Sequence, residues 1–105
     1  PVAAVNGDKG NDIICLQVSP GQKLTLDASA SSDPDGDAMT FHWWVYKEAG
    51  TYANNVMIAN PDEDEIQVTV PADASGKEIH IVLEVLDKHP EIGMYDYRRV
   101  VLQVD

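Results

Sequence analysis

Short runs of alternating apolar and polar residues, separated by turn residues, constrain the fold of this chain more than any other feature. No segment has a sustained apolar period of about 3.6 residues, so helices are not expected to build the core. Alternation with a period of two is instead typical of strands that bury one face. Strands are expected at 2–5, 13–18, 23–28, 40–46, 66–70, 78–86 and 97–104, with a short edge strand at 56–58.

Seven or eight such strands with regularly spaced turns predict an all-β fold, namely a two-sheet sandwich. The 105 residues fit a single domain spanning 1–105, and they contain no internal repeat. Cys15 lies in an apolar run and is expected to be a small buried core residue. As the single cysteine, it excludes an intrachain disulfide and a multi-cysteine zinc site.

The chain is strongly acidic, with 18 Asp and Glu against 7 Lys and Arg and a formal net charge of −11. Nucleic-acid binding needs a basic patch that neutralises phosphates, so nucleic acid is not expected as a partner. An anionic membrane surface is disfavoured for the same reason, and no apolar run approaches the roughly 18 residues of a membrane-spanning helix. Neutral ligands such as polysaccharides, and cations, remain open as ligand classes.

Residues 33–37 read Asp-Pro-Asp-Gly-Asp and predict a tight acidic turn. Asp33 at the first position of a type I turn can accept a hydrogen bond from the backbone ahead of it. Pro34 presets φ near −65° at the second position, and Gly36 at the fourth can take a positive φ. Turn geometry therefore explains these three residues.

The same geometry leaves Asp35 and Asp37 unexplained, because three carboxylates within five residues repel one another unless water or a cation joins them. Calcium prefers several oxygen ligands, so the turn is either solvated or part of a calcium site. Further ligands would have to come from loops that follow other strands, and Asn6 and Asp87 are the candidates there. The spacing is not that of an EF-hand loop.

The predicted strand 40–46 carries aromatic residues on both faces. Successive side chains of a strand point to opposite faces, so Trp43 shares a face with Phe41 and Val45 and is assigned to the core. His42, Trp44 and Tyr46 point to the other face. These side chains either offer a flat aromatic platform for sugar rings or are covered by the loop holding Tyr52 or by a neighbouring domain. The ligand-binding set for this face is His42, Trp44, Tyr46 and Tyr52.

The sequence lacks the motifs of an active site. It contains no nucleophile-elbow pattern and no His-Glu-x-x-His metal motif. Its acidic residues include no pair that a sequence feature selects for glycoside hydrolysis. The chain is therefore expected not to be an enzyme and to require no cofactor.

Two stretches resemble the signature of PKD-type (polycystic kidney disease) immunoglobulin-like domains: the acidic segment 28–37 and the Phe-His-Trp that follows at 41–43. The Phe-Gly-Asp-Gly turn that usually follows the Trp is missing. The continuation at 43–52, together with 70–81 and 97–101, looks like the C-terminal sandwich module of a bacterial family described as cellulose-binding proteins, whose larger domain is nucleoside-hydrolase-like.

The resemblance implies an immunoglobulin-like sandwich that forms the C-terminal part of a larger secreted or periplasmic bacterial protein. It also implies polysaccharide, or the neighbouring domain, as the partner of a module that is monomeric in isolation. By resemblance to calcium-binding PKD-like domains, a calcium site would use Asn6, Asp35 and Asp87, with Asp33 and Asp37 as alternates.

Overall fold

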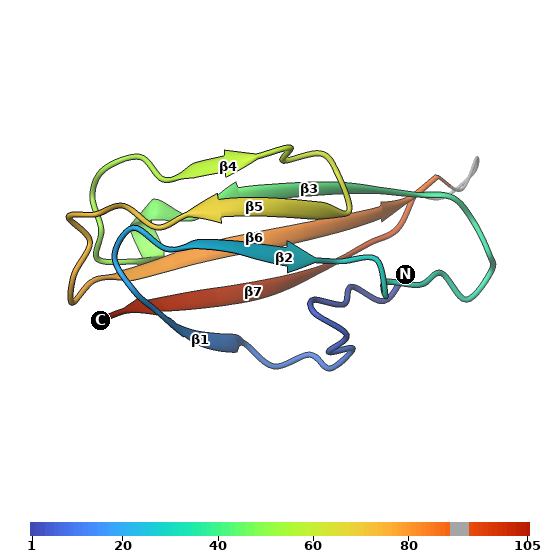
Figure 1. Cartoon of the computed structure of the whole chain (residues 1–105). Helices are drawn as coiled ribbons and strands as arrows, with labels where there is room; N and C mark the ends of the chain where they lie inside the picture. Colours follow the sequence, from blue (N-terminus) through green and yellow to red (C-terminus); the bar gives the residue numbers. More distant parts are fainter. Residues whose placement is uncertain (89–92) are drawn as a thin grey trace.

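The computed structural model describes residues 1–88 and 93–105, and this part of the chain forms seven strands in two sheets (Figure 1). One sheet has the strand order β1-β7-β6-β3 and the other has the order β2-β5-β4. The all-β sandwich predicted from the sequence is therefore confirmed. The strands are β1 Ile14–Val18, β2 Lys23–Asp27, β3 Met39–Val45, β4 Met57–Ala59, β5 Glu65–Thr69, β6 Glu78–Asp87 and β7 Tyr95–Val104.

The four-stranded sheet is built around its two longest strands, β6 and β7, which have 10 residues each. β6 pairs antiparallel with both β3 and β7, while β1 runs parallel to β7 at the edge. This register aligns side chains of three strands in rows across each face. Two successive rows on the outer face are Trp44, Val82 and Arg99, and then His42, Glu84 and Tyr97.

The core lies between the two sheets, where the predicted inward residues meet. Trp43 is 1% exposed, and its indole N–H donates to the carbonyl oxygen of Glu63 at 2.9 Å. The assignment of Trp43 rather than Trp44 to the core is confirmed. Other fully buried side chains of the core come from both sheets and include Leu26, Ile66, Val68, Ile81, Leu83, Val85, Val100 and Leu102.

The strand predicted at 2–5 does not form, and only isolated bridges join Val2 to Ser32 and Val5 to Asp8. The N–H of Ala3 donates to Asp96 Oδ2 at 2.8 Å, and that of Ala4 donates to Ser31 Oγ at 2.9 Å. Because side-chain oxygens take these donors, no ladder is formed. The other predicted strands are confirmed to within two residues at each end.

Cys15 is exposed, which corrects its expected place in the core. In β1 the residues that pack toward the core are Ile14, Leu16 and Val18, so the strand's alternation turns Cys15 to the outer face. The apolar run around this cysteine has hydrophobic residues of both parities, and the sequence alone therefore misassigned it.

A short loop after β3 packs against the start of β6. It contains the 3₁₀ helix η1, Lys47–Ala49. Among the described residues, no helix is long and apolar enough to cross a membrane. The N–H of Tyr46 donates to the His80 carbonyl at 2.9 Å, and that of Thr51 donates to the Glu78 carbonyl at 2.9 Å. His80 alternates with the core-facing Ile79 and Ile81 and points outward, but it is buried beneath this loop, next to Gly50.

Candidate functional site

The outer face of the four-stranded sheet contains a hollow of about 310 Å³. Leu83 in β6 and Val100 in β7 face the core. The residues that alternate with the core-facing ones in each strand therefore point to the outer face. Three strands contribute to the lining. These residues are Trp44 from the end of β3 and Tyr46 just after it, Val82 and Glu84 from β6, and Tyr95, Tyr97 and Arg99 from β7.

One wall of the hollow is the aromatic pair at the end of β3. The ring centroids of Trp44 and Tyr46 lie 5.3 Å apart, and the ring planes are tilted by 40°. The indole N–H of Trp44 donates to Glu84 Oε1 at 3.1 Å. Because Trp44 lies opposite Val82 in the register, this bond runs diagonally to the neighbouring row and fixes the indole across two strands.

The opposite wall comes from β7 and is more open. The rings of Tyr95 and Tyr97 are stacked, with centroids 6.4 Å apart, and the two residues are 67% and 61% exposed. The Arg99 guanidinium lies 5.3 Å from the centroid of the Tyr46 ring, within the range of a cation–π contact. Val82, in the row between Trp44 and Arg99, is almost fully buried although it points away from the core.

The acidic turn adopts the geometry expected from its sequence. The N–H of Gly36 donates to the Asp33 carbonyl at 3.0 Å, and the N–H of Asp35 donates to Asp33 Oδ1 at 2.8 Å. Gly36 has a φ of 72°, a left-handed conformation that glycine adopts without steric strain. The turn hydrogen bond between Asp33 and Gly36 and the side-chain bond of Asp33 therefore account for the loop's shape.

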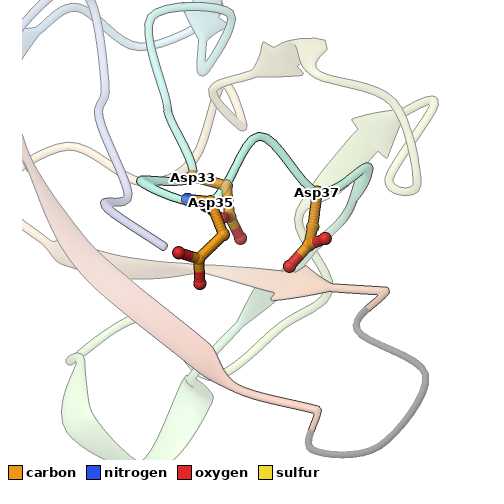
Figure 2. Close-up of side chains that lie close together, drawn as sticks. All are labelled: Asp33, Asp35 and Asp37. Atoms are coloured by element: carbon orange, nitrogen blue, oxygen red, sulfur yellow. Dashed lines mark hydrogen bonds between the residues drawn. The ribbon is translucent and has the colours of Figure 1, made fainter.

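The turn brings three carboxylates together (Figure 2). One oxygen each from Asp33, Asp35 and Asp37 lies within 4.8 Å of the others, and all three side chains project to the same side of the loop. The Oδ2 atoms of Asp33 and Asp37 are buried and have no hydrogen-bond partner. Buried carboxylate oxygens without partners are unfavourable, and a hard cation would satisfy them.

The two more distant residues expected at this site make other contacts. Asn6 Oδ1 accepts from the N–H of Asp27 at 3.0 Å. Asp87 Oδ1 accepts from the N–H of Met94 at 2.9 Å. Among the described residues, the group of three aspartates does not include Asp87. Three of the five expected metal ligands, Asp33, Asp35 and Asp37, therefore form one group of carboxylates in the described part of the chain.

Comparison with known proteins identifies the family. A family model described as "Cellulose-binding protein Sde0182, C-terminal domain" matches residues 23–104. The chain belongs to this family. The matched range includes every residue that lines the hollow and all three aspartates of the turn.

A solved structure agrees with this family of cellulose-binding protein C-terminal domains. It is a nucleoside hydrolase-related hypothetical protein from Saccharophagus degradans, described as associated with carbohydrate metabolism. The two are 41% identical over 99% of this chain, with a TM-score of 0.96, and this chain spans 25% of that protein's chain. A chimeric titin Z1Z2 also matches, at 13% identity over 100% of this chain and 97% of its own, with a TM-score of 0.45. No curated protein matches significantly.

The expected ligand residues of this Sde0182-type C-terminal domain divide into two groups. Trp44 and Tyr46 lie in the hollow. His42 lies outside it, exposed, with Nδ1 at 2.9 Å from Asp62 Oδ1. Tyr52 packs against the core cluster, and its hydroxyl donates to Asp73 Oδ1 at 2.6 Å, which raises the pKa of Tyr52 above its usual value.

The side of the hollow that β6 and β7 form was not identified by the sequence analysis. Its residues are Val82, Glu84, Tyr95, Tyr97 and Arg99. A signal for them was present, because the inward residues have odd numbers in the strand 78–86 and even numbers in the last strand. The residues of opposite parity in each strand must face outward. What the sequence did not contain is the register that places these residues beside Trp44.

Proposed function

We propose that this chain is a non-catalytic accessory module of a secreted or periplasmic bacterial protein, and that it binds glycan in the hollow on its outer sheet face. The observation that carries this proposal is the aromatic lining of that hollow by Trp44, Tyr46, Tyr95 and Tyr97. Sugar rings pack their C–H faces on aromatic rings, and binding sites combine such apolar walls with a few fixed polar groups. Glu84 and Arg99 are the polar groups here.

The membership in a cellulose-binding protein family supports the same proposal. So does the 41% identity to a protein described as associated with carbohydrate metabolism. The acidity of the chain is compatible with a neutral glycan, which carries no charge to be repelled. The binding function is attributed to the hollow because it combines exposed rings, a carboxylate and a guanidinium in one place.

Retention on insoluble amorphous cellulose, whose chains are not held in a crystal lattice, tests this function. The wild-type chain should sediment with the polymer, and Trp44→Ala should lose most of that retention because it removes a ring from the aromatic wall of the hollow. Met57→Ala is the matched control, since Met57 is 74% exposed on β4 of the other sheet. A wild-type chain that stays entirely in the supernatant would remove direct glycan binding.

A second candidate is docking of the same face on a nucleoside-hydrolase-like domain. The observation that favours it is the apolar extension of the hollow: Leu86, opposite Tyr95, is 41% exposed, and Met94 is 58% exposed. Exposed apolar patches of this kind often mark protein interfaces. In this case iodide would quench Trp44 emission in the isolated chain, and addition of the nucleoside-hydrolase-like domain would protect it. Unchanged quenching would count against docking.

The acidic turn is proposed as a structural calcium site, because the Oδ2 atoms of Asp33 and Asp37 are buried without partners. A ligand that binds only the folded state raises its stability. The melting temperature should therefore be higher in calcium than in chelator, and Asp35→Asn should reduce the difference. Asp64→Asn, in the separate acidic loop before β5, is the control. Identical melting curves with and without calcium would argue against the site.

A further inference from the structure

The shape of the hollow restricts the physical form of the glycan that it accepts. Flat crystalline surfaces are best matched by rings that lie in one plane, but the Trp44 and Tyr46 planes are tilted by 40°. The hollow between these rings and the tyrosines of β7 has a volume of about 310 Å³. That volume lies at the lower end of the range for small-ligand sites, about 300–1,000 Å³. A single sugar chain can enter such a hollow, whereas a crystal face would touch only its rim.

The carboxylate in the hollow is held in position before a ligand arrives. Glu84 Oε1 accepts from the indole N–H of Trp44 at 3.1 Å. An ionised carboxylate has two oxygens and about four acceptor positions, so this bond leaves capacity for a ligand. The carboxylate is thus an oriented acceptor that can take a hydrogen bond from a sugar hydroxyl.

The guanidinium in the hollow supplies the complementary donors. Arg99 lies against the ring of Tyr46, with 5.3 Å between the guanidinium carbon and the ring centroid. In residues 1–88 and 93–105, no side-chain hydrogen bond or ion pair of Arg99 occurs, so its donors face the solvent or a ligand. In the register Arg99 pairs with Val82 and Glu84 pairs with Tyr97, which makes the carboxylate and the guanidinium diagonal neighbours.

The charges of the hollow favour a neutral sugar over an acidic one. An isolated arginine would suit the carboxylate of a uronic acid, but here the Glu84 carboxylate lines the same hollow. The whole chain has a formal net charge of −11, and its field repels a polyanion approaching from solvent. A pair of adjacent hydroxyls matches both groups, since one hydroxyl donates to the carboxylate and the other accepts from the guanidinium.

We propose that the hollow binds a single chain of neutral sugars, with adjacent hydroxyls bridging Glu84 and Arg99 and with rings packed against Trp44 and Tyr97, and that it does not bind a crystalline polysaccharide surface. This inference rests on the proposed glycan-binding function and specifies its ligand. The chemistry that it requires is a neutral hexose with vicinal hydroxyl groups in a chain that is free of a crystal lattice.

Two measurements with three probes test the inference. Titration calorimetry uses cellohexaose as the neutral chain and polygalacturonate as the acidic chain. Sedimentation uses microcrystalline cellulose as the crystalline surface. Wild type should bind cellohexaose and show little retention on the crystalline probe. Glu84→Gln should weaken cellohexaose binding by roughly tenfold, or about 1.4 kcal/mol, because a hydrogen bond to a charged acceptor is stronger than one to a neutral amide. Glu65→Gln, an exposed glutamate on β5 of the other sheet, should leave it unchanged.

The outcomes separate this inference from the glycan-binding function itself. Retention on microcrystalline cellulose without cellohexaose binding would overturn the single-chain form and leave glycan binding in place. Wild-type binding of polygalacturonate as tight as that of cellohexaose would overturn neutrality, because the Glu84 carboxylate and the net negative charge should weaken binding of an acidic chain. Cellohexaose binding that is equal in wild type and Glu84→Gln would overturn the role of the carboxylate. Binding to none of the three probes would overturn the proposed function as well.

Discussion

The indole N–H of Trp44 donates to Glu84 Oε1 at 3.1 Å and joins β3 to β6 across the outer face of the sheet. Trp44 pairs with Val82 in the register, so the indole reaches diagonally to the next row. The bond orients the ring and one carboxylate oxygen together. A site that is ordered before its ligand arrives loses less conformational entropy on binding, which favours affinity.

Tyr97→Ala should weaken retention on amorphous cellulose. Tyr97 is 61% exposed and stacks with Tyr95 on the open wall of the hollow, so its ring is available to a sugar. An aromatic contact is worth about 0.5–1.5 kcal/mol beyond its area, which corresponds to roughly a two- to tenfold loss. Depletion from the supernatant, measured over a range of cellulose concentrations, gives the ratio. Equal retention of Tyr97→Ala and wild type would exclude β7 from the binding surface.

The two tryptophans illustrate how far sequence reasoning reaches. Alternation places them on opposite faces, and the apolar neighbours of Trp43 assign that residue to the core without any knowledge of the fold. The structure agrees, with Trp43 at 1% exposure and Trp44 in the hollow. The same parity rule turns Tyr95 and Tyr97 outward. Which residues lie next to Trp44, however, depends on the pairing of β3, β6 and β7, which local sequence does not determine.

Gly50→Ala should destabilise the fold. A Cβ at this position would lie 2.4 Å from the Glu78 carbonyl oxygen, which is a backbone atom and cannot rotate away. Overpacking typically costs about 1–3 kcal/mol. Urea unfolding should show a lower midpoint for this variant. Gly93→Ala, whose Cβ would meet nothing within 4 Å, is the control. A Gly50→Ala midpoint equal to that of the control would mean that the loop yields without loss of stability.

Arg98→Ala should also lower the free energy of unfolding. Arg98 is 2% exposed, and its guanidinium donates to the carbonyl oxygens of Asp8 and Asp12 at 2.8 Å each. Removing a partner from a part-buried acceptor costs about 1–3 kcal/mol, and the lost packing adds to that. Arg99→Ala, one residue along on the outer face, should change stability by no more than about 0.5 kcal/mol. If the two substitutions lowered the free energy of unfolding equally in urea, the hydrogen bonds of Arg98 to the N-terminal segment would not contribute as predicted.

The burial of Arg98 could not be predicted from the sequence. Arginine is rarely fully buried. The alternation of side chains along β7 predicts that Arg98 points inward, but it does not predict how deeply the side chain is buried. Its partners Asp8 and Asp12 lie in the N-terminal segment, far away in the sequence. Contacts of the same kind accompany the absence of the expected strand at 2–5, where the N–H groups of Ala3 and Ala4 donate to the side chains of Asp96 and Ser31. Such tertiary contacts leave no local pattern.

Acid should destabilise the chain through Asp8. Its pKa lies below the usual 3.8, chiefly because the Gly10 N–H donates to Oδ1 and secondarily because of Arg98. A lowered carboxylate pKa adds stability that is fully present above pH 3.8 and is lost as the pH falls through the native value. Melting temperature should therefore drop below about pH 4, and the drop should be shallower in Asp8→Asn. Parallel pH profiles for the two proteins would contradict this role.

Tryptophan emission during a titration with cellohexaose tests the central claim most directly, because the two tryptophans report on different places. Trp43 is buried in the core, while Trp44 lines the hollow. Binding in the hollow predicts a saturable change in wild-type emission and no change in Trp44→Phe, where Trp43 alone remains. Constant wild-type emission, or a change that persists undiminished in Trp44→Phe, would contradict glycan binding at this hollow.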